Sequence, residues 1–202
     1  QALWLHNQKL SLRHDLPLPQ VAAGQALVRV RMGGICSTDL EMLHGYVSFE
    51  GVPGHEFVGE VVAVPGSDLG VGQWVGKRVV GEINLACGQC EACRRGRPTH
   101  CESRSVLGIR GQNGSFAEFL NLPLENLHHV PDAVPDENAV FTEPLAAALE
   151  IQQQVSVRPS DRVLVVGAGR LGLLVAQVLA LSGCDLKVVV RRPAQRELLK
   201  LW

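Results

Sequence analysis

Hydrophobic and polar residues alternate in several short stretches of the first part of the chain. The segment ALVRVRMGGI, residues 26–35, places apolar and polar side chains in turn. The segments FVGEVVAV, residues 57–64, and KRVVGE, residues 77–82, add two further runs that are punctuated by glycine and proline. Because side chains on a strand point alternately to opposite faces, this period predicts strands with one buried face. We therefore expect a β-rich barrel within residues 1–150.

The alternation gives way to a helical composition between residues 136 and 155. This segment reads DENAVFTEPLAAALEIQQQV, with acidic residues at its start and an alanine- and glutamine-rich continuation. Acidic residues are favoured in the first turn of a helix, and the composition of the continuation is helical. We expect this helical segment to bridge two domains whose boundary lies near residue 150.

Residues 151–202 show the order strand, helix, strand. An apolar run, Val163–Val166, leads into a helix-like segment that ends near Gly183. A second apolar run, LKVVV at residues 186–190, follows, and we expect Asp185 to precede that strand. This order predicts the start of a Rossmann sheet, so the fold class is α/β with a β-rich part. Two parallel strands cannot bury both faces of a parallel sheet, so we expect a fragment, or a chain completed by something else.

Composition and charge narrow the functional classes. With 46% hydrophobic residues among 202, the chain can bury a substantial core, and its net charge of −1 gives no attraction for nucleic acid or an anionic membrane. No apolar run reaches the about 18 to 20 residues of a membrane span, and the N-terminus lacks the pattern of a secretory signal. We therefore expect a cytoplasmic protein. In that reducing compartment, clustered cysteines favour metal binding over disulfide bonds.

Four of the six cysteines lie in one short stretch, CGQCEACRRGRPTHC, with the spacing C-x2-C-x2-C-x7-C. Structural zinc takes four thiolates tetrahedrally, which predicts zinc ligands at Cys87, Cys90, Cys93 and Cys101. The surrounding lobe, residues 84–111, is polar and glycine-rich, so we expect the metal to supply its core. Two disulfides are the less favoured alternative. A redox pair in CGQC is less favoured still, because the segment lacks the flanking strand and helix that such motifs use.

A second candidate metal site lies upstream, in GGICSTDLEMLHG and GVPGHEFVGEVVAV. Cys36, His55 and Glu56 offer one sulfur, one nitrogen and one oxygen donor. Zinc enzymes use such mixed sets when one position must stay open for water or substrate. Taken singly, each residue is ambiguous, because a lone cysteine is often a small core residue and a His-Glu pair is often a polar strand end.

The segment around residues 161–183 carries the pattern of a dinucleotide site. Its glycines are spaced G-x-G-x-x-G between an apolar run and a helix-like segment, whose first N–H groups would face a pyrophosphate. At the end of the second strand, where an acidic residue would bind the ribose of NAD, the chain has two arginines. Arginine can neutralise a 2′-phosphate, which favours NADP, although the arginines could also lie in a solvated loop. The predicted cofactor-binding residues are Gly167, Gly169, Arg170, Leu171, Gly172, Arg191 and Arg192.

The motifs GICSTD, PGHEFVGEV, the four-cysteine loop and GAGRLG together resemble the zinc-containing medium-chain alcohol dehydrogenases, in the branch that includes sorbitol and threonine dehydrogenases. The resemblance covers nearly the whole chain, in the order and spacing of the family. It implies a GroES-like catalytic domain that carries the structural zinc lobe, followed by an NAD(P)-binding Rossmann domain that is incomplete here. It also implies a homo-oligomer, a dimer or a tetramer.

The resemblance implies particular roles at the second metal site. Cys36 and His55 would bind a catalytic zinc, and Glu56 would be a ligand that exchanges with water. Glu143, in TEPLA, resembles the position that is a glutamate in the sorbitol and threonine branch. Without the resemblance, Glu143 is simply an acidic residue in the first turn of a helix.

Two residues near Cys36 are the expected catalytic residues. Thr38 corresponds to the hydroxyl that the family places against the substrate oxygen, where it can accept and pass on a proton. Glu41 occupies the position where many relatives carry a histidine of the proton relay. Asp39 is interpreted as structural, orienting a metal ligand.

These inferences predict an oxidoreductase that holds two zinc ions per chain. It would transfer hydride between a secondary alcohol, of the polyol or sugar-alcohol type, and NADP or NAD. The alternative from another class is a truncated, non-catalytic module that zinc stabilises, because hydride transfer needs a bound cofactor. A zinc-free quinone reductase relative is disfavoured by both sets of metal donors.

Overall fold

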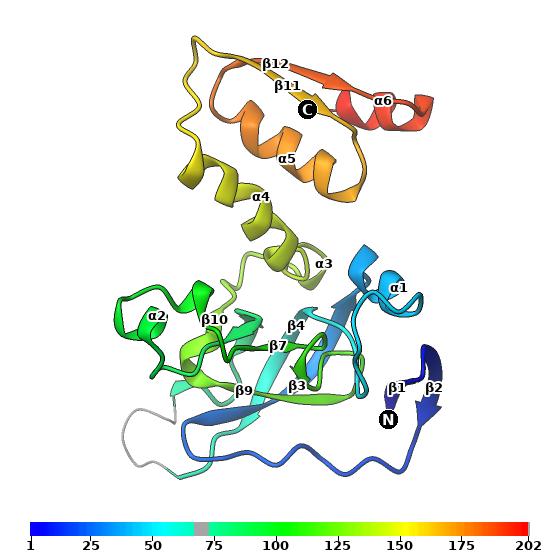
Figure 1. The fold of residues 1–202 in the computed structure, drawn as a ribbon, viewed down its shortest axis with the longest axis vertical. Helices are drawn as coiled ribbons and strands as arrows, with labels where there is room; N and C mark the ends of the chain where they lie inside the picture. Colours follow the sequence, from blue (N-terminus) through cyan, green and yellow to red (C-terminus); the bar gives the residue numbers. More distant parts are fainter. Residues whose placement is uncertain (67–72, 202) are drawn as a thin grey trace. The chain divides into compact units, whose positions relative to one another are not determined.

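The computed structural model describes residues 1–66 and 73–201, and the chain divides into two compact units, Gln1–Glu143 and Pro144–Trp202. The helix α4, Thr142–Gln154, contains this division. The expected boundary near residue 150 lies within the same helix. Figure 1 shows the strands of the first unit and the smaller strand–helix–strand arrangement of the second.

The first unit is built on a five-stranded antiparallel sheet with the order β10-β5-β4-β3-β9. The three alternating segments predicted to be strands form β3, β4 and β5, which confirms the period-two interpretation. The remaining strands come from the region before the helical segment, and β10 contains the two adjacent histidines. The strands are β3 Gln25–Gly34, β4 Glu56–Ala63, β5 Arg78–Gly81, β9 Phe119–Pro123 and β10 Leu127–His129.

The two faces of β4 enter two different cores. Phe57 and Val61 belong to the main hydrophobic cluster, which also takes in side chains from β3, β5, β9 and β10. Val58 points to the other face, where a smaller cluster is completed by Val140 and Ala139, beside the short helix α3, Asp136–Ala139. This double burial explains why β4 is almost continuously apolar rather than strictly alternating.

The segment expected to be helical forms two helices, α3 and α4. The break falls at Val140 and Phe141, of which Val140 is buried in the smaller cluster. The hydroxyl of Thr142 donates to the carbonyl of Ala139 at 2.7 Å and so helps to close the junction. Pro144 lies in the first turn of α4, where its missing N–H has no helical partner to lose. Packing of the junction therefore decides the break, which composition did not predict.

The smaller elements of the first unit are short. A hairpin joins β1, Ala2–His6, to β2, Lys9–Arg13, through two residues with positive φ. A three-stranded sheet of β6, β7 and β8 carries the cysteine lobe. The remaining bounds are α1 Ser37–Met42, β6 Asn84–Leu85, α2 Glu91–Arg94, η2 Pro98–His100, β7 Ser105–Leu107, β8 Gly111–Gln112 and η3 Leu124–Asn126.

After α4, the second unit forms a parallel β–α–β arrangement, as expected. The strands β11, Arg162–Val166, and β12, Asp185–Val189, pair in parallel, and α5, Arg170–Ala180, connects them before α6, Pro193–Leu199. The expectation for Asp185 was wrong by one residue, because it pairs with Arg162 as the first residue of β12. On this two-stranded sheet Leu164 and Val166 remain 60% and 76% exposed.

Arg78 connects the main sheet to α3. Its guanidinium donates to a carboxylate oxygen of Asp136 at 2.8 Å and to the carbonyls of Pro131 and Val134 at 2.9 Å each. Arg31 donates to the second carboxylate oxygen of Asp136 at 2.7 Å. Burial raises the pKa of Asp136, but the two arginines outweigh this effect and hold it below its ordinary value.

We expect Asp136→Asn to lower the free energy of unfolding by about 1–3 kcal/mol at pH 7, because two guanidinium groups lose a charged acceptor. The pKa is lower in the folded state, so the carboxylate stabilises the fold above its unfolded pKa of about 3.9 and loses this effect as pH falls. The difference from the wild type should therefore shrink in acid. Urea unfolding at several pH values checks this, with exposed Glu137→Gln as control; a difference independent of pH would contradict it.

Candidate metal and cofactor sites

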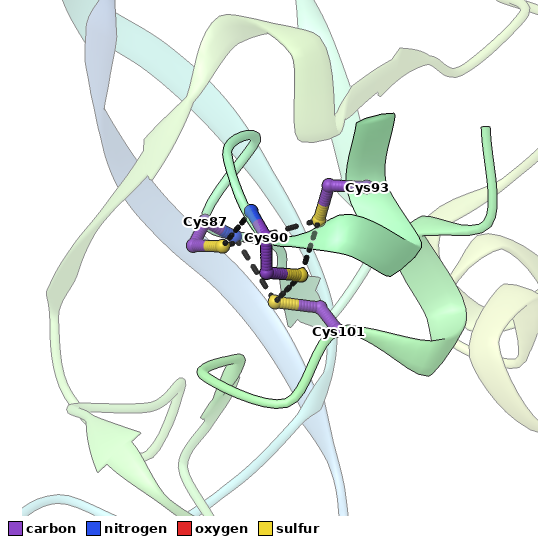
Figure 2. Close-up of side chains that lie close together, drawn as sticks. All are labelled: Cys87, Cys90, Cys93 and Cys101. Atoms are coloured by element: carbon purple, nitrogen blue, oxygen red, sulfur yellow. Dashed lines mark hydrogen bonds between the residues drawn. The ribbon is translucent and has the colours of Figure 1, made fainter. Parts of the chain in front are cut away.

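The four predicted zinc ligands of the lobe converge on one point (Figure 2). The Sγ atoms lie 3.5 Å apart for Cys90 and Cys93, 3.9 Å for Cys90 and Cys101, and 4.0 Å for Cys87 and Cys93. A tetrahedral zinc with bonds of about 2.3 Å separates its sulfurs by about 3.8 Å. A disulfide needs only about 2.05 Å. The spacing therefore fits a metal and is too long for a disulfide.

Backbone N–H groups point at these sulfurs. The N–H of Cys87 donates to Sγ of Cys101, and the N–H of Cys90 donates to Sγ of Cys87, both at 3.3 Å. A backbone donor at Cys93 is the main cause that lowers the pKa of the Cys90 thiol to about 6. Burial and the neighbouring thiols raise the pKa of Cys93 to about 12. The pKa values of Cys90 and Cys93 therefore lie far apart, and a divalent cation bound between the sulfurs would favour the thiolate form.

The lobe is anchored more firmly than its composition suggested. Leu107 of β7 is fully buried in the main core, and Leu85 and Val106 pack against the same cluster. Between residues 86 and 104, which the structure describes in full, only Cys101 is buried. The expectation that a metal supplies the core of residues 84–111 therefore does not hold for β6 and β7, which pack on the main core. The loop that carries the thiols is the part of the lobe without such anchoring.

The argument against a redox pair in CGQC also needs correction. A short strand, β6, precedes Cys87, and a short helix, α2, begins after its N-cap residue Cys90. The motif therefore has both flanking elements, although they are two and four residues long. What disfavours a redox pair is instead the convergence of two further thiols, Cys93 and Cys101, on the same point.

We expect Cys90→Ser to remove one zinc ion per chain and to open the loop, since three thiolates hold zinc far less tightly than four. Elemental analysis gives the zinc content, and limited proteolysis after the exposed arginines of the loop reports its opening. The matched control is Cys184→Ser, because Cys184 lies apart from the cluster, where its thiol donates to the carbonyl of Leu179 at 3.7 Å. Unchanged zinc in Cys90→Ser would contradict the assignment.

The second donor set forms where β3 ends and β4 begins. Cys36 is the N-cap residue of α1, His55 directly precedes β4, and Glu56 is its first residue. One donor atom from each of the three lies within 4.8 Å of the others. His55 and Glu56 are only 3% and 7% exposed. A buried carboxylate beside a thiol and an imidazole is costly unless a cation binds between them.

Asp39 lies beside two of these donor residues, Cys36 and His55. One carboxylate oxygen accepts the backbone N–H of Cys36 at 2.8 Å, and the other lies 3.4 Å from Nδ1 of His55. Neither this oxygen nor Nδ1 has a hydrogen bond in the part of the chain that the structure describes. A small rotation of the ring would form that bond and leave Nε2 for a metal.

The electrostatics of His55 favour a cation in this position. Burial lowers its pKa, but Asp39 and then Cys36 outweigh burial and raise it to about 9. The raised pKa favours a proton on this imidazole, which marks the position as one that suits a positive charge. A zinc ion would displace that proton, as metal binding to histidine and cysteine generally does. The donors, their spacing and the unsatisfied Asp39–His55 pair all fit zinc.

The remaining predicted site residues differ in how closely they approach this set. The Thr38 hydroxyl oxygen lies 3.6 Å from the sulfur of Cys36. Glu41 is exposed on α1, and its carboxylate has no hydrogen bond or ion pair among the described residues. Glu143 is not among the closely grouped donors. Burial is the main cause that raises its pKa; His55 opposes this, while Glu56 and other nearby carboxylates add to it.

Three glycines that sequence reasoning did not single out hold the segment before His55 in place. A Cβ atom at Gly108 or Gly114 would lie 2.1 or 2.0 Å from the carbonyl oxygen of Gly54. Both backbones therefore contact the PGHE turn directly, and Gly108 also adopts a positive φ of 66°. Only glycine permits such an approach. The glycines of GIRGQNGS are visible in the sequence, but nothing there indicates which turn they contact.

The predicted dinucleotide motif lies between β11 and α5. Gly167 adopts a positive φ of 98°, and Gly169 is the N-cap residue of α5. Arg170 and Leu171 are the first two residues of that helix. A Cβ atom at Gly172 would lie 2.2 Å from the carbonyl oxygen of Gly167, so the helix can approach the turn only with glycine there. Arg191 and Arg192 follow β12 and are exposed; the N–H of Arg192 donates to Gln195 at 3.4 Å.

Comparison with known proteins identifies the family of this fold and these donor sets. Residues 22–132 match the family described as the alcohol dehydrogenase GroES-like domain. The chain belongs to this family, and within it to the zinc-containing medium-chain alcohol dehydrogenases of the sorbitol and threonine dehydrogenase-like branch. The predicted fold class, with a GroES-like domain before a nucleotide-binding domain, is confirmed.

Among characterised relatives, D-altritol 5-dehydrogenase of Agrobacterium fabrum is 39% identical over 84% of this chain and 51% of its own length. L-threonine 3-dehydrogenase of a Chelativorans species is 39% identical over 87% of this chain and 51% of its own. The chain thus spans about half the length of the curated relatives it matches.

Two solved structures are similar over nearly the whole chain. A protein of Sinorhizobium meliloti described as a zinc-binding dehydrogenase, bound to NADP, aligns with a TM-score of 0.88 and 30% identity, over 99% of this chain and 58% of that one. An alcohol dehydrogenase of Escherichia coli complexed with NADH aligns with a TM-score of 0.87 and 32% identity, over 97% of this chain and 58% of that one.

No helix among the described residues is long and apolar enough to cross a membrane.

Proposed function

We propose that this chain is the catalytic part and the start of the nucleotide-binding part of a zinc-dependent dehydrogenase. The enzyme would transfer hydride between a secondary alcohol and NAD(P). The observation that carries the proposal is the group of Cys36, His55 and Glu56, whose donor atoms lie within 4.8 Å of one another and of which His55 and Glu56 are buried. A purely structural zinc site would be closed by four strong ligands, as the cysteine lobe is.

The residues of the chain would divide the work as follows. Cys36 and His55 hold the metal, with Glu56 as the ligand that yields to water or substrate. Bound there, zinc supplies a Lewis acid that polarises the alcohol oxygen. Asp39 holds the backbone of Cys36 and, after a small rotation of the ring, would also hold the imidazole of His55, which would keep both donors aimed at one point.

Proton movement would begin at Thr38. Its hydroxyl lies next to the sulfur of Cys36, where it can contact the substrate oxygen and accept its proton. The next group in the relay is proposed to be Glu41, one helical turn further along α1. Glu143, whose pKa burial raises, is proposed as a further carboxylate on the same metal.

The proposed cofactors are two zinc ions per chain, at the catalytic set and at the cysteine lobe, and NADP in preference to NAD. The preference rests on Arg191 and Arg192 directly after β12, where a 2′-phosphate would need a cation. The proposed substrate is a small polyol or sugar alcohol, which the likeness to D-altritol 5-dehydrogenase supports. A homo-oligomer stays a prediction.

The zinc content of Cys36→Ser tests the proposal. We expect about two zinc ions in the wild type and about one in this variant, because losing the thiolate leaves only imidazole and carboxylate donors. In the full-length protein, kcat/KM for alcohol oxidation should fall about a thousandfold or more, since the metal contributes several kcal/mol to the transition state. Cys184→Ser is the control for both measurements.

A wild type with about one zinc ion, all of it retained in Cys36→Ser, would contradict the proposal. That result would favour the alternative of a non-catalytic module that zinc stabilises. Such a module needs the cysteine lobe but has no physical need for a second, three-donor site.

Cofactor choice is tested by Arg191→Asp in the full-length protein. We expect NADP affinity to fall roughly 10- to 100-fold, because a charge-assisted contact to the 2′-phosphate is worth about 1.5–3 kcal/mol, while NAD affinity changes little or rises. Titration of cofactor fluorescence measures both affinities. Arg162→Asp is the matched control, since Arg162 is exposed at the opposite, amino end of β11. Equal NADP affinity in Arg191→Asp and the wild type would contradict the role of Arg191.

A further inference from the structure

Glu56 lies in the space that a side chain at position 34 would fill. Gly34 and Glu56 are directly paired residues of β3 and β4. A Cβ atom built on Gly34 would lie 2.3 Å from the carboxylate oxygen Oε2 of Glu56 and 2.9 Å from its Cβ atom. Side chains of a directly opposed pair normally lie next to each other on the same face of a sheet. Here one of the two is missing, and the other folds across the gap.

The backbone of Gly34 gives no other reason for glycine. Its φ lies outside the positive range, in contrast to twelve other glycines among the described residues, so alanine would fit the local conformation. The neighbouring Gly33 also has an ordinary φ, and a Cβ there would lie 3.6 Å from the ring of Phe116, a normal contact. Of these two adjacent glycines, only Gly34 is required by what lies opposite it.

The rest of the Glu56 environment is fixed. The Ser115 hydroxyl, 2% exposed, donates to the carbonyl of Glu56 at 3.4 Å, and the Ser115 N–H donates to the carbonyl of Gly54 at 2.9 Å. These two bonds oppose a shift of the backbone around His55 that would relieve crowding at the Glu56 side chain. With this backbone held, Glu56 places one carboxylate oxygen within 4.8 Å of the donors of Cys36 and His55, and its Oε2 lies where a Cβ atom of residue 34 would crowd it.

We propose that Gly34 is a positioning residue for Glu56: its missing side chain makes room for the carboxylate to act as the third, exchangeable ligand of the proposed catalytic metal. Any side chain at this position displaces the carboxylate from the other two donors. The inference rests on the proposed function, because it concerns the metal at the same site. Gly34 offers no ligand atom itself, so it would shape the metal site without binding the metal.

Gly34→Ala tests this inference through metal binding rather than through turnover. Cobalt replaces zinc at both sites, and its visible absorption depends on the ligands and geometry of each. We expect Gly34→Ala to weaken cobalt at the Cys36–His55 site about 10- to 100-fold, the usual cost of disturbing the support of a metal ligand, and to shift its absorption bands. Cobalt at the four-cysteine site should be unchanged in the same sample, which shows that the variant is folded.

Two further variants separate the inference from a general effect on folding. Gly33→Ala adds the same methyl group one residue away and should leave both cobalt sites as in the wild type. In a Glu56→Ala background, adding Gly34→Ala should produce little further loss, since the carboxylate that it displaces is gone. Full additivity of the two substitutions would overturn the inference.

The outcomes distinguish this inference from the proposed function. If wild-type protein binds cobalt only at the four cysteines, the proposed catalytic site fails, and the role of Gly34 fails with it. If the wild type binds cobalt at both sites and Gly34→Ala retains its affinity and absorption bands, the proposed function stands and the inference about Gly34 is wrong.

Discussion

The antiparallel pairing of β3 with β4 is the constraint on which the candidate catalytic site depends. The chain leaves β3 after Gly34 and returns at Glu56 of β4, the residue that pairs with Gly34. The segment between these two residues therefore starts and ends at the same end of the β3–β4 pair. Cys36 just after one strand and His55 just before the other are therefore neighbours, although nineteen positions separate them. Irregular pairing between Val30 and Met32 adjusts which side chains of β3 face β4 beyond that point. A different register would separate the donors without altering any of them.

Close approach at glycine residues is the second constraint on this site. Gly54 meets Gly108 and Gly114 where the cysteine lobe packs against the turn before His55, and Gly34 leaves room for Glu56. In each case backbone or carboxylate occupies the volume of an absent side chain. The lobe and the donor set are thus physically connected: the strands that flank the thiol loop are anchored in the main core, and the same region supports the turn that presents His55. Stability of the lobe and geometry of the second site should not be regarded as independent.

Several features were predictable because they are local. The four thiols lie within fifteen positions, so a short loop can bring them together whatever the rest of the chain does. The G-x-G-x-x-G turn likewise needs only the strand before it and the helix after it, and the structure provides both. Other features were missed because they depend on distant partners. The break between α3 and α4 follows from burial of Val140, and the link from Arg78 to Asp136 spans 58 positions.

The sequence by itself determined the types of donor, their local spacing and the alternation that forms the sheet. It also determined the membership of the dehydrogenase family. Each of these depends on residues that lie close together along the chain. Only the tertiary structure decided which of these residues meet. Asp39 faces His55, and Gly34 faces Glu56, through strand pairing and helix placement that no local pattern specifies. The physical reason is that a metal site needs donors placed to within a fraction of an ångström, whereas sequence periodicity specifies only the face of a strand or helix to which a side chain points.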